Sequence, residues 1–432
     1  MNNITHLFIR LSEQRLANAL FWLGSAQILG RIVRLGASII IARLLTPEVF
    51  GEVAIILTCF ELLVTPTRRI SSAALIKMDS SDYIASLGSA NRLNWIACLS
   101  ALTIMCLLSL PLSLYYHKPG LIAPMLLMAS SYLLLPFGML YAAQNLKHNR
   151  MRIVGRAVLW QTLFDGALTA LLALFGLGIW AIIVPKVLAV LVWIWVHRQD
   201  NPLPYHRGIK TSSLPAGMTT PQMARFGVQI GLSDLLLFLR QNIDYLLIGY
   251  LLGVEALGIY FFAFNASLGI SMGLIQSYGT ALYSHLCAGE DKATHYLKSL
   301  KLIAGISLPL ITLQALLAPW YLPLVYGQQW IDAGALPIFL LLCLSGLTRP
   351  LGEAASQLLI ALGKSRFNLI SNGAFTALLM LGILLASPWG LVGIATAVLA
   401  LHLIVLPLFS LYLYLSLPAF APSSPSLQGE SL

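Results

Sequence analysis

The chain has 432 residues, of which 58% are hydrophobic and only 10% are charged, and its formal net charge is +10. Soluble domains contain about 25% charged residues, so this composition leaves too few polar side chains to cover a surface in water. A soluble globular protein is excluded, and the sequence predicts a polytopic membrane protein.

Long apolar runs follow one another along the chain, and each is long enough to cross a membrane. A spanning helix needs roughly 20 mostly apolar residues, whereas the strands of an outer-membrane barrel are about 10 residues long and alternate in polarity. We therefore expect an all-α protein with twelve transmembrane helices, at about 19–43, 49–66, 87–110, 119–143, 157–176, 178–197, 225–252, 256–284, 299–319, 333–362, 367–387 and 389–416.

A segment rich in Pro, Gly and Ser separates the first six spans from the last six. It contains "DNPLPYHRGIKTSSLPAGMTTP", a composition typical of a flexible linker. We expect an N-terminal six-helix lobe over residues 1–197, a cytoplasmic linker over 198–224, a C-terminal six-helix lobe over 225–416, and a disordered cytoplasmic tail over 417–432.

The basic residues between the spans are distributed unevenly. If the N-terminus is cytoplasmic, nearly all of them fall on the cytoplasmic side, and the outer side holds only Lys118 and, at a helix edge, Arg43. This is the positive-inside pattern, so we expect a multi-pass protein of the bacterial inner membrane with both termini in the cytoplasm. The distribution also argues against nucleic acid as a partner.

The two halves of the sequence resemble each other. "LLTPEVFG" (44–51) matches "LLGVEALG" (251–258) at an offset of 207, and "GLGIWA" (176–181) matches "GLVGIA" (390–395) at an offset of 214. Six spans per half is an even number, so both copies have the same orientation in the membrane. We expect two pseudo-symmetric lobes related by an axis along the membrane normal, as in transporters that rock two lobes about a central site.

Three stretches carry a family resemblance: "ARLLTPEVFGEVAIIL" (42–57), "SSAALIKM" (71–78) and "ALGKSRFNLI" (361–370). The sequence resembles the polysaccharide exporters of the multidrug/oligosaccharidyl-lipid/polysaccharide superfamily, in particular O-antigen (Wzx-type) and exopolysaccharide flippases. The resemblance implies two six-helix bundles that form a V. It also implies transport of an undecaprenyl-diphosphate-linked oligosaccharide across the inner membrane.

A polar stripe on the first predicted span is the main candidate for substrate binding. Gln27, Arg31, Arg34 and Ser38 recur at helical spacing, and a polar stripe on an apolar span is expected to face a cavity or another helix. Arginine suits a diphosphate because its planar fork can hold two phosphate oxygens at once. The alternative is that Arg31 and Arg34 pair across the bundle with Asp165 or Glu61.

Further charged residues lie within other predicted spans. Lys186 is central in the sixth span, and the 207-residue offset maps the polar stripe onto Asp234 and Gln241 in the seventh. Arg240 and Asp244 form an opposite-charge i, i+4 pair in that span, as Arg349 and Glu353 do in the tenth. We expect a site with substrate-binding residues Arg31, Arg34, Lys186, Gln27, Gln241 and Arg240, and with Asp244 and Asp234 coupling transport to H⁺ or Na⁺.

Each of these charges also has a purely structural alternative, in which Arg240 and Asp244, or Arg349 and Glu353, neutralise each other. His402 lies on an apolar face, and we expect it to be a buried histidine with a backbone partner. The five cysteines are scattered in apolar stretches without ligand spacing, so no metal or other cofactor is expected.

The leading hypothesis is a flippase that works by alternating access in surface polysaccharide biosynthesis, with membrane lipids as its surroundings, and not an enzyme. An ion-coupled multidrug or cation antiporter of the same superfamily is the alternative, although acidic residues are then expected to dominate the cavity. A glycan polymerase or ligase is expected to carry a large outer loop, which this sequence lacks. A peptidoglycan-precursor flippase is expected to have more than twelve spans. No Walker A sequence is present, so an ion or substrate gradient has to supply the energy.

Overall fold

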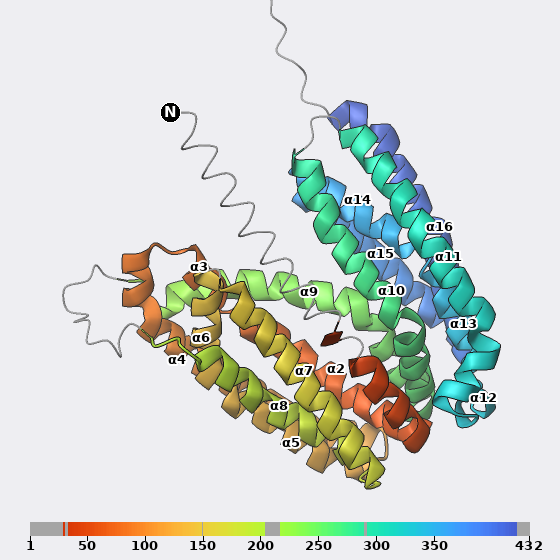
Figure 1. Ribbon diagram of the computed structural model, residues 1–432, viewed down its shortest axis with the longest axis horizontal. Helices are drawn as coiled ribbons and strands as arrows, with labels where there is room; N and C mark the ends of the chain where they lie inside the picture. Colours follow the sequence, from red (N-terminus) through yellow and green to blue (C-terminus); the bar gives the residue numbers. More distant parts are fainter. Residues whose placement is uncertain (1–28, 31–32, 149, 204–216, 289–291, 421–432) are drawn as a thin grey trace, which may run out of the picture. The chain divides into compact units, whose positions relative to one another are not determined.

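The computed structural model describes residues 29–30, 33–148, 150–203, 217–288 and 292–420 (Figure 1). Every regular element within these residues is a helix, so the predicted all-α fold is confirmed. The chain divides into two compact units. Unit 1 comprises Met1–Gly249 with Gly253–Gly258, and unit 2 comprises Tyr250–Leu252 with Ile259–Leu432.

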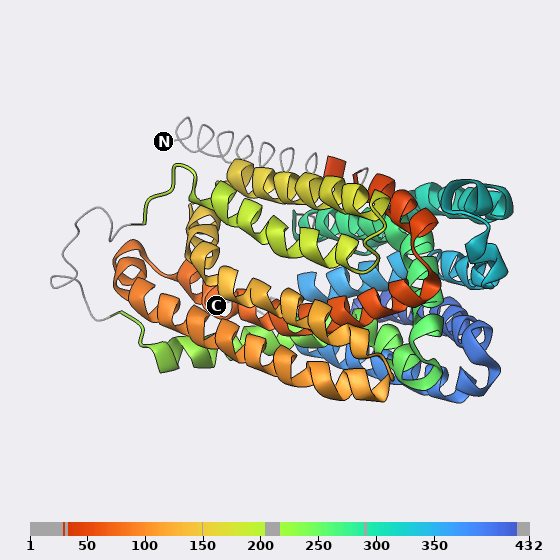
Figure 2. The same cartoon turned by 90° about the horizontal axis from the view of Figure 1, so that it is seen from below.

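Unit 1 begins with helical residues 33–44 and contains most of α9. Between them it holds α2 (Pro47–Arg69), α3 (Ser72–Lys77), α4 (Ser80–Tyr115), η1 (Pro119–Leu121), α5 (Ile122–Leu134), α6 (Pro136–Lys147), α7 (Met151–Leu174) and α8 (Trp180–Arg198), before α9 (Thr220–Leu252). α7 and α8 lie side by side in both views (Figures 1 and 2). α5 and α6 are bent by 52° where Pro136 begins the second helix, because proline has no N–H to continue the hydrogen-bond ladder.

Unit 2 contains the remaining helices around a core of its own. They are α10 (Val254–Ala288, which begins in unit 1), α11 (Lys292–Tyr326), α12 (Gln329–Asp332), α13 (Ala335–Ser345), α14 (Arg349–Ala361), α15 (Ser365–Ala386), η4 (Ser387–Trp389) and α16 (Gly390–Phe420). Tyr296 is fully buried in this core, and its hydroxyl lies 2.7 Å from the Ser410 hydroxyl, which joins α11 to α16. α16 continues to Phe420, so it includes the first residues of the predicted tail, and 421–432 lie outside the described residues.

The predicted spans coincide with these helices. The spans at 119–143 and 333–362 each correspond to two consecutive helices, α5 with α6 and α13 with α14. About half of the first span, residues 19–28 and 31–32, lies outside the described residues. In the part of the chain that the structure describes, seven helices are long and apolar enough to cross a membrane, or up to nine if each bent pair is one span. Residues Arg366–Leu417, which include most of α15 and α16, are one of these seven, and Val254–Gly269 of α10 is a shorter apolar helix in addition to them. The chain is therefore a multi-pass membrane protein.

The internal repeat extends through the order of the helices. α2 begins at Pro47 and α10 begins 207 positions later at Val254. Each is followed by a long helix (α4 or α11), a consecutive pair (α5–α6 or α13–α14) and two further helices (α7–α8 or α15–α16). Gly176 and Gly390, matched at the 214-residue offset, have φ angles of 72° and 68°. Glycine is needed at both places because side chains disfavour this left-handed region.

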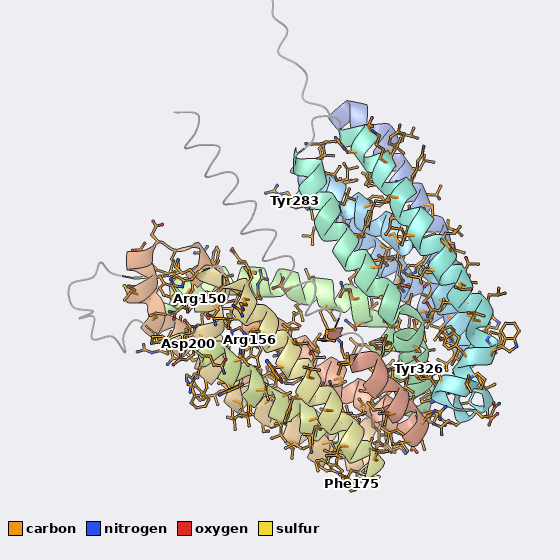
Figure 3. The ribbon with its side chains drawn as sticks, in the orientation of Figure 1. Arg150, Arg156, Phe175, Asp200, Tyr283 and Tyr326 are labelled. Atoms are coloured by element: carbon orange, nitrogen blue, oxygen red, sulfur yellow. The ribbon has the colours of Figure 1, made fainter. Side chains whose placement is uncertain are left out.

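The residues that follow α8 form hydrogen bonds with α6 and with Arg150, the residue before α7. Asn201 is 1% exposed, and its Nδ2 donates hydrogen bonds to the carbonyl oxygens of Tyr141 (3.1 Å) and His197 (3.2 Å). Arg150 donates to the Asn201 Oδ1 at 3.3 Å and to the Asp200 carbonyl, and Figure 3 shows Arg150 and Asp200 at the same end of unit 1. The predicted linker 198–224 therefore starts with an ordered segment, and its central residues 204–216 lie outside the described residues.

Replacing Asn201 with alanine is expected to lower the free energy of unfolding by about 1–3 kcal/mol, because the Tyr141 and His197 carbonyl oxygens and the Arg150 guanidinium each lose one hydrogen bond. The thermal midpoint of the detergent-solubilised protein measures the change. Thr396→Ala is the control, since Thr396 is exposed and bonds only to Val392 of its own helix. Equal midpoints for the two variants would show that the Asn201 contacts add nothing to stability.

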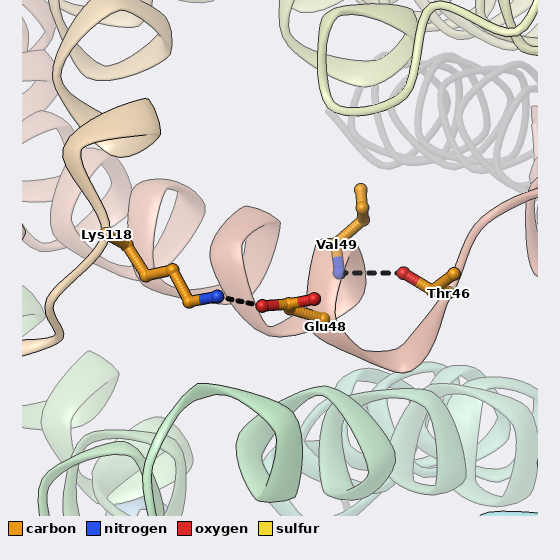
Figure 4. Close-up of polar contacts among 4 residues, drawn as sticks. All are labelled: Thr46, Glu48, Val49 and Lys118. Carbon is orange, nitrogen blue, oxygen red and sulfur yellow. Dashed lines mark hydrogen bonds and ion pairs between the residues drawn. The ribbon is translucent and has the colours of Figure 1, made fainter.

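The "TPE" motif predicted between the first two spans forms the start of α2 (Figure 4). Thr46 has an extended backbone, and its hydroxyl accepts a hydrogen bond from the Val49 N–H, while Pro47 occupies the first helical position. Proline is favoured there because its fixed φ suits a helix and its missing N–H is not needed. Glu48, in the same first turn, forms an ion pair with Lys118 of the turn after α4.

The start of α2 crosses the start of α10 within unit 1, and both crossing points are glycines of the repeat. A Cβ atom on Gly51 would lie 1.8 Å from the carbonyl oxygen of Val254. A Cβ atom on Gly258 would lie 1.8 Å from the carbonyl oxygen of Pro47. The contact is reciprocal, since each matched glycine meets a carbonyl oxygen at the start of the other helix. Glycine at 51 and 258 allows the two backbones to touch.

Candidate functional site

The helix formed by residues 33–44 packs against α7 through small residues. A Cβ atom on Gly166 would meet Val33 at 2.8 Å and Ala37 at 3.7 Å, and Gly30 faces Thr162 at 3.5 Å. Side chains of this helix that point away from α7 are therefore available for other contacts.

Arg34 is exposed, and its side chain has no ion pair or hydrogen bond with another residue that the structure describes. Ser38, from the same predicted stripe, donates a hydrogen bond to the Leu35 carbonyl oxygen of its own helix at 2.8 Å. Gln27 and Arg31, the other members of the stripe, lie outside the described residues.

Lys186 of α8 forms an ion pair with Asp165 of α7. The Lys186 Nζ lies 3.2 Å from the Asp165 Oδ2, and the two side chains are 32% and 24% exposed. The Asp165 Oδ1 is buried and has no hydrogen-bond partner among the described residues. Of the two arginines expected as alternative partners for Asp165, Arg31 lies outside the described residues, and Arg34 forms no described ion pair with it.

The Lys186–Asp165 pair lies near the middle of both spans. Lys186 is seven residues after Ile179, where the helix is capped, and Asp165 is ten residues before Phe175, which caps α7. At 1.5 Å per residue these separations correspond to depths of about 10 and 15 Å in a hydrocarbon layer of about 30 Å. Charged groups at such depths face other protein groups or a water-filled space rather than lipid.

Asp234, an expected coupling residue, pairs with Arg69 at the end of α2. The Arg69 Nε lies 3.5 Å from the Asp234 Oδ2, with 56% of the arginine side chain and 27% of the aspartate side chain exposed. Two glycines bring α9 close enough to α2 for this pair. A Cβ atom on Gly227 would lie 1.8 Å from the Ile70 carbonyl oxygen, and one on Gly231 would lie 3.1 Å from Pro66.

The other expected residues of α9 differ in their exposure. Asp244 is 4% exposed, and its Oδ1 accepts a hydrogen bond from the Tyr245 N–H at 3.0 Å. Arg240 is half-buried, whereas Gln241 is exposed. All the expected site residues that the structure describes belong to unit 1, because α9 packs there up to Gly249.

In unit 2, the Glu353 Oε1 accepts a hydrogen bond from the Gln357 Nε2 at 2.7 Å, and the Arg349 guanidinium lies 5.5 Å from the centre of the Phe264 ring. Gly279 of α10 faces Glu353, and a Cβ atom there would lie 2.3 Å from the Glu353 Oε1. His402 is buried, with its Nδ1 2.7 Å from the Val398 carbonyl oxygen, which confirms the predicted backbone partner.

Sequence reasoning missed two functionally relevant features of unit 1. The partnership of Arg69 with Asp234 joins residues far apart in the sequence, and the only signal was the basic "TPTRR" end of α2. The buried Asn145 was also missed. Its Nδ2 donates to the His197 carbonyl oxygen at 3.0 Å and orders the same end of unit 1 as Asn201.

The fold is shared with solved transporter structures. The lipid II flippase MurJ aligns with a TM-score of 0.73 at 12% sequence identity, over 92% of this chain and 88% of MurJ. A multidrug resistance MATE family transporter of the MOP superfamily aligns with a TM-score of 0.69 at 13% identity, over 94% of this chain and 99% of that one. At these identities the likeness shows the fold alone.

Two named relatives have higher sequence identity. The lipopolysaccharide biosynthesis protein WzxC of Escherichia coli K12 is 25% identical over 224 residues, which are 46% of this chain and 45% of WzxC. The teichuronic acid biosynthesis protein TuaB of Bacillus subtilis 168 is 23% identical over 308 residues, 68% of this chain and 60% of TuaB. The matches thus span less than two thirds of either relative.

The match to a protein family covers a larger part of the chain than the match to WzxC. The family described as "Polysaccharide biosynthesis protein" matches residues 40–335, from the end of the first predicted span to the start of α13. This match covers more than half of the chain and includes the "TPE" turn, the Lys186–Asp165 pair and all of α9. The chain belongs to the polysaccharide biosynthesis protein family.

Proposed function

We propose that this protein is a flippase that moves a polyprenyl-diphosphate-linked oligosaccharide across the bacterial inner membrane by alternating access, for surface polysaccharide biosynthesis. Membership in the polysaccharide biosynthesis family supports the pathway, and the name of one relative, WzxC, refers to lipopolysaccharide. The fold shared with the lipid II flippase MurJ supports translocation of a lipid-linked sugar rather than its polymerisation.

The observation that carries the proposal is Lys186, about one third exposed, near the middle of the α7 and α8 spans. A charge at this depth is costly unless it serves a polar ligand or partner. Arg34, exposed on the helix that packs against α7, supplies a second cation in the same unit. Together they offer charge-assisted hydrogen bonds to a diphosphate, which compensate for its removal from water. Arg31, Gln27, Arg240 and Gln241 complete the proposed substrate-binding set.

Asp244 is one candidate for coupling transport to H⁺ or Na⁺. It is 4% exposed in α9, where a carboxylate is costly to bury as an isolated charge. Asp234 is the second candidate, but its carboxylate has to leave Arg69 before it binds an ion. The inner membrane as location, with both termini in the cytoplasm, rests on the basic residues at one end of unit 1. These include Lys147, Arg150, Arg152 and Arg198.

Translocation by the purified protein in vesicles tests the proposed function. A polyprenyl-diphosphate-linked trisaccharide with a fluorescent label is the probe, and its appearance in the opposite leaflet is followed by quenching. Arg34→Ala is expected to reduce the initial rate about tenfold or more, because one charge-assisted hydrogen bond contributes about 1.5–3 kcal/mol. Arg34→Lys is expected to restore part of the rate. Lys118→Ala, which removes a cation from a connecting turn, is expected to transport normally.

The second candidate function is an ion-coupled drug antiporter, favoured by the buried carboxylate of Asp244 and by the shared fold of the MATE transporter. The same vesicles distinguish the two functions. Expulsion of a cationic dye along an imposed proton gradient, with no movement of the lipid-linked trisaccharide, would replace the flippase by the antiporter.

A further inference from the structure

We propose that Asp165 is the resident counterion of the diphosphate site: its carboxylate occupies Lys186 while substrate is absent and releases Lys186 to the incoming diphosphate. Asp165 is then a positioning residue that sets how tightly substrate is held and how readily it leaves. This inference rests on the proposed function and assigns a role to a residue outside the expected substrate-binding set.

Lys186 contacts only one of the two oxygens of the Asp165 carboxylate. The Lys186 Nζ contacts one carboxylate oxygen, Oδ2, at 3.2 Å, whereas Oδ1 is buried and has no hydrogen-bond partner among the described residues. A buried ion pair stabilises a protein only when further hydrogen bonds satisfy its remaining lone pairs. Among the residues that the structure describes, nothing else satisfies the Asp165 carboxylate, so Lys186 alone holds it in this part of the chain.

The pair is also within reach of a ligand. The Lys186 and Asp165 side chains keep 32% and 24% of their surface exposed at a depth where charges do not face lipid. Each ammonium has three donors, so one contact with Asp165 leaves donors for a phosphate oxygen. A diphosphate carries more negative charge than a carboxylate and is the stronger partner for Lys186.

The helix around Lys186 lacks one backbone hydrogen bond. Pro185 precedes Lys186 within α8 and has no N–H to bond to the Ala181 carbonyl oxygen. Helices bend at such positions with less resistance than elsewhere. The turn that carries Lys186 can therefore shift by a small amount and exchange one anionic partner for another without breaking a regular hydrogen bond.

Partner exchange has a measurable consequence. When the competent state of a site is only partly populated, the apparent dissociation constant is the intrinsic one divided by the populated fraction. If Asp165 occupies Lys186 about nine tenths of the time, its removal tightens diphosphate binding about tenfold. In the proposed exchange Asp165 also competes for Lys186 while the diphosphate leaves, so a transporter without Asp165 is expected to bind better and to release its substrate more slowly.

Calorimetry on the full-length protein in detergent tests this, with inorganic pyrophosphate and farnesyl diphosphate as two separate probes. Asp165→Asn is expected to bind both probes about tenfold more tightly and to transport the lipid-linked trisaccharide several-fold more slowly. A structural role would instead weaken binding and turnover together. The double variant Asp165→Asn with Lys186→Met is expected to lose binding. Glu48→Gln, which neutralises the carboxylate of the exposed Lys118 pair, is expected to match the wild type.

Two other binding results would contradict the proposed role of Asp165 or its assignment to a carrier lipid. Unchanged binding by Asp165→Asn overturns the counterion role, and tighter binding of inorganic pyrophosphate alone overturns the assignment to a carrier lipid. The wild-type transport assay is read independently. Transport by the wild type with unchanged Asp165→Asn binding overturns only this inference, whereas no transport by the wild type overturns the proposed function.

If Asp165→Asn does not fold, chemical labelling of the unmodified protein tests the same exchange of partners. A hydrophobic carbodiimide reacts with carboxyl groups that have left their cationic partner and taken up a proton, and mass spectrometry locates the adduct. Labelling of Asp165 is expected to rise several-fold when farnesyl diphosphate is added. Labelling that stays constant or falls would show that the diphosphate does not displace Asp165 from Lys186.

Discussion

Gly51→Ala and Gly258→Ala are each expected to abolish most of the folded protein in the membrane and to lower the thermal midpoint of the remainder. A Cβ atom at either position would lie 1.8 Å from a backbone carbonyl oxygen, that of Val254 or Pro47. A flexible side chain can rotate away from such a contact, but a carbonyl within a helix cannot. Overpacking a close contact costs typically about 1–3 kcal/mol, and a backbone clash falls at or above the upper end of this range.

Gly305→Ala in α11 is the matched control for these two variants. Gly305 also lies within a helix, but nothing is within 4 Å of the position of its Cβ atom. Alanine is favoured over glycine in a helix interior by about 0.5–1 kcal/mol, so this variant is expected to be as stable as the wild type or slightly more stable. Membrane yield and thermal midpoint measure all three variants. If Gly51→Ala and Gly305→Ala behave alike, the helix starts do not touch at Gly51.

Lys186→Met is expected to be strongly destabilising, and Asp165→Asn in the same chain is expected to rescue it. Methionine has a similar length but removes the ammonium that pairs with the Asp165 carboxylate, whose Oδ1 is buried without a partner among the described residues. Removal of one partner of a fully buried pair costs about 3–5 kcal/mol, and we expect about 2–3 kcal/mol here because both side chains are partly exposed.

The rescue separates stability from function. The double variant Lys186→Met with Asp165→Asn has no charge left unpaired at the site, so its thermal midpoint is expected to return to within a few degrees of the wild type. Its transport of the lipid-linked trisaccharide is expected to stay at background, since the cation that binds the diphosphate is gone. Wild-type transport by the double variant would remove Lys186 from the substrate site.

The Lys118–Glu48 pair gives the comparison for an exposed site. Both of its side chains are at least a third exposed, and surface ion pairs contribute about 0–1 kcal/mol. The contrast with Lys186 arises from depth in the membrane, because a charge left unpaired there has less access to bulk water than one in a connecting turn.

The helices of this protein were largely predictable because their causes are local. A run of apolar residues is enough to specify a membrane helix, and Thr46 and Pro47 specify its start by hydrogen bonding and ring geometry. The repeat could also be recognised, since Gly176 and Gly390 lie at the same point of each copy and both have a positive φ angle. The division of the chain was harder to predict. The sequence suggested residues 198–224, but close contacts keep α9 in unit 1 as far as Gly249.

The sequence by itself determined the class of the protein, its helical runs, its repeat and the residue types available for a diphosphate, all properties of composition and short-range spacing. Only the tertiary structure decided which charges meet. Asp165 lies beside Lys186 and Asp234 beside Arg69, and the spacing of residues along the sequence indicated neither of these two pairs. Periodicity states which residues share a face of one helix. The neighbour of that face depends on packing between helices, as at Gly227 and Gly231, where the absence of side chains brings α9 onto α2.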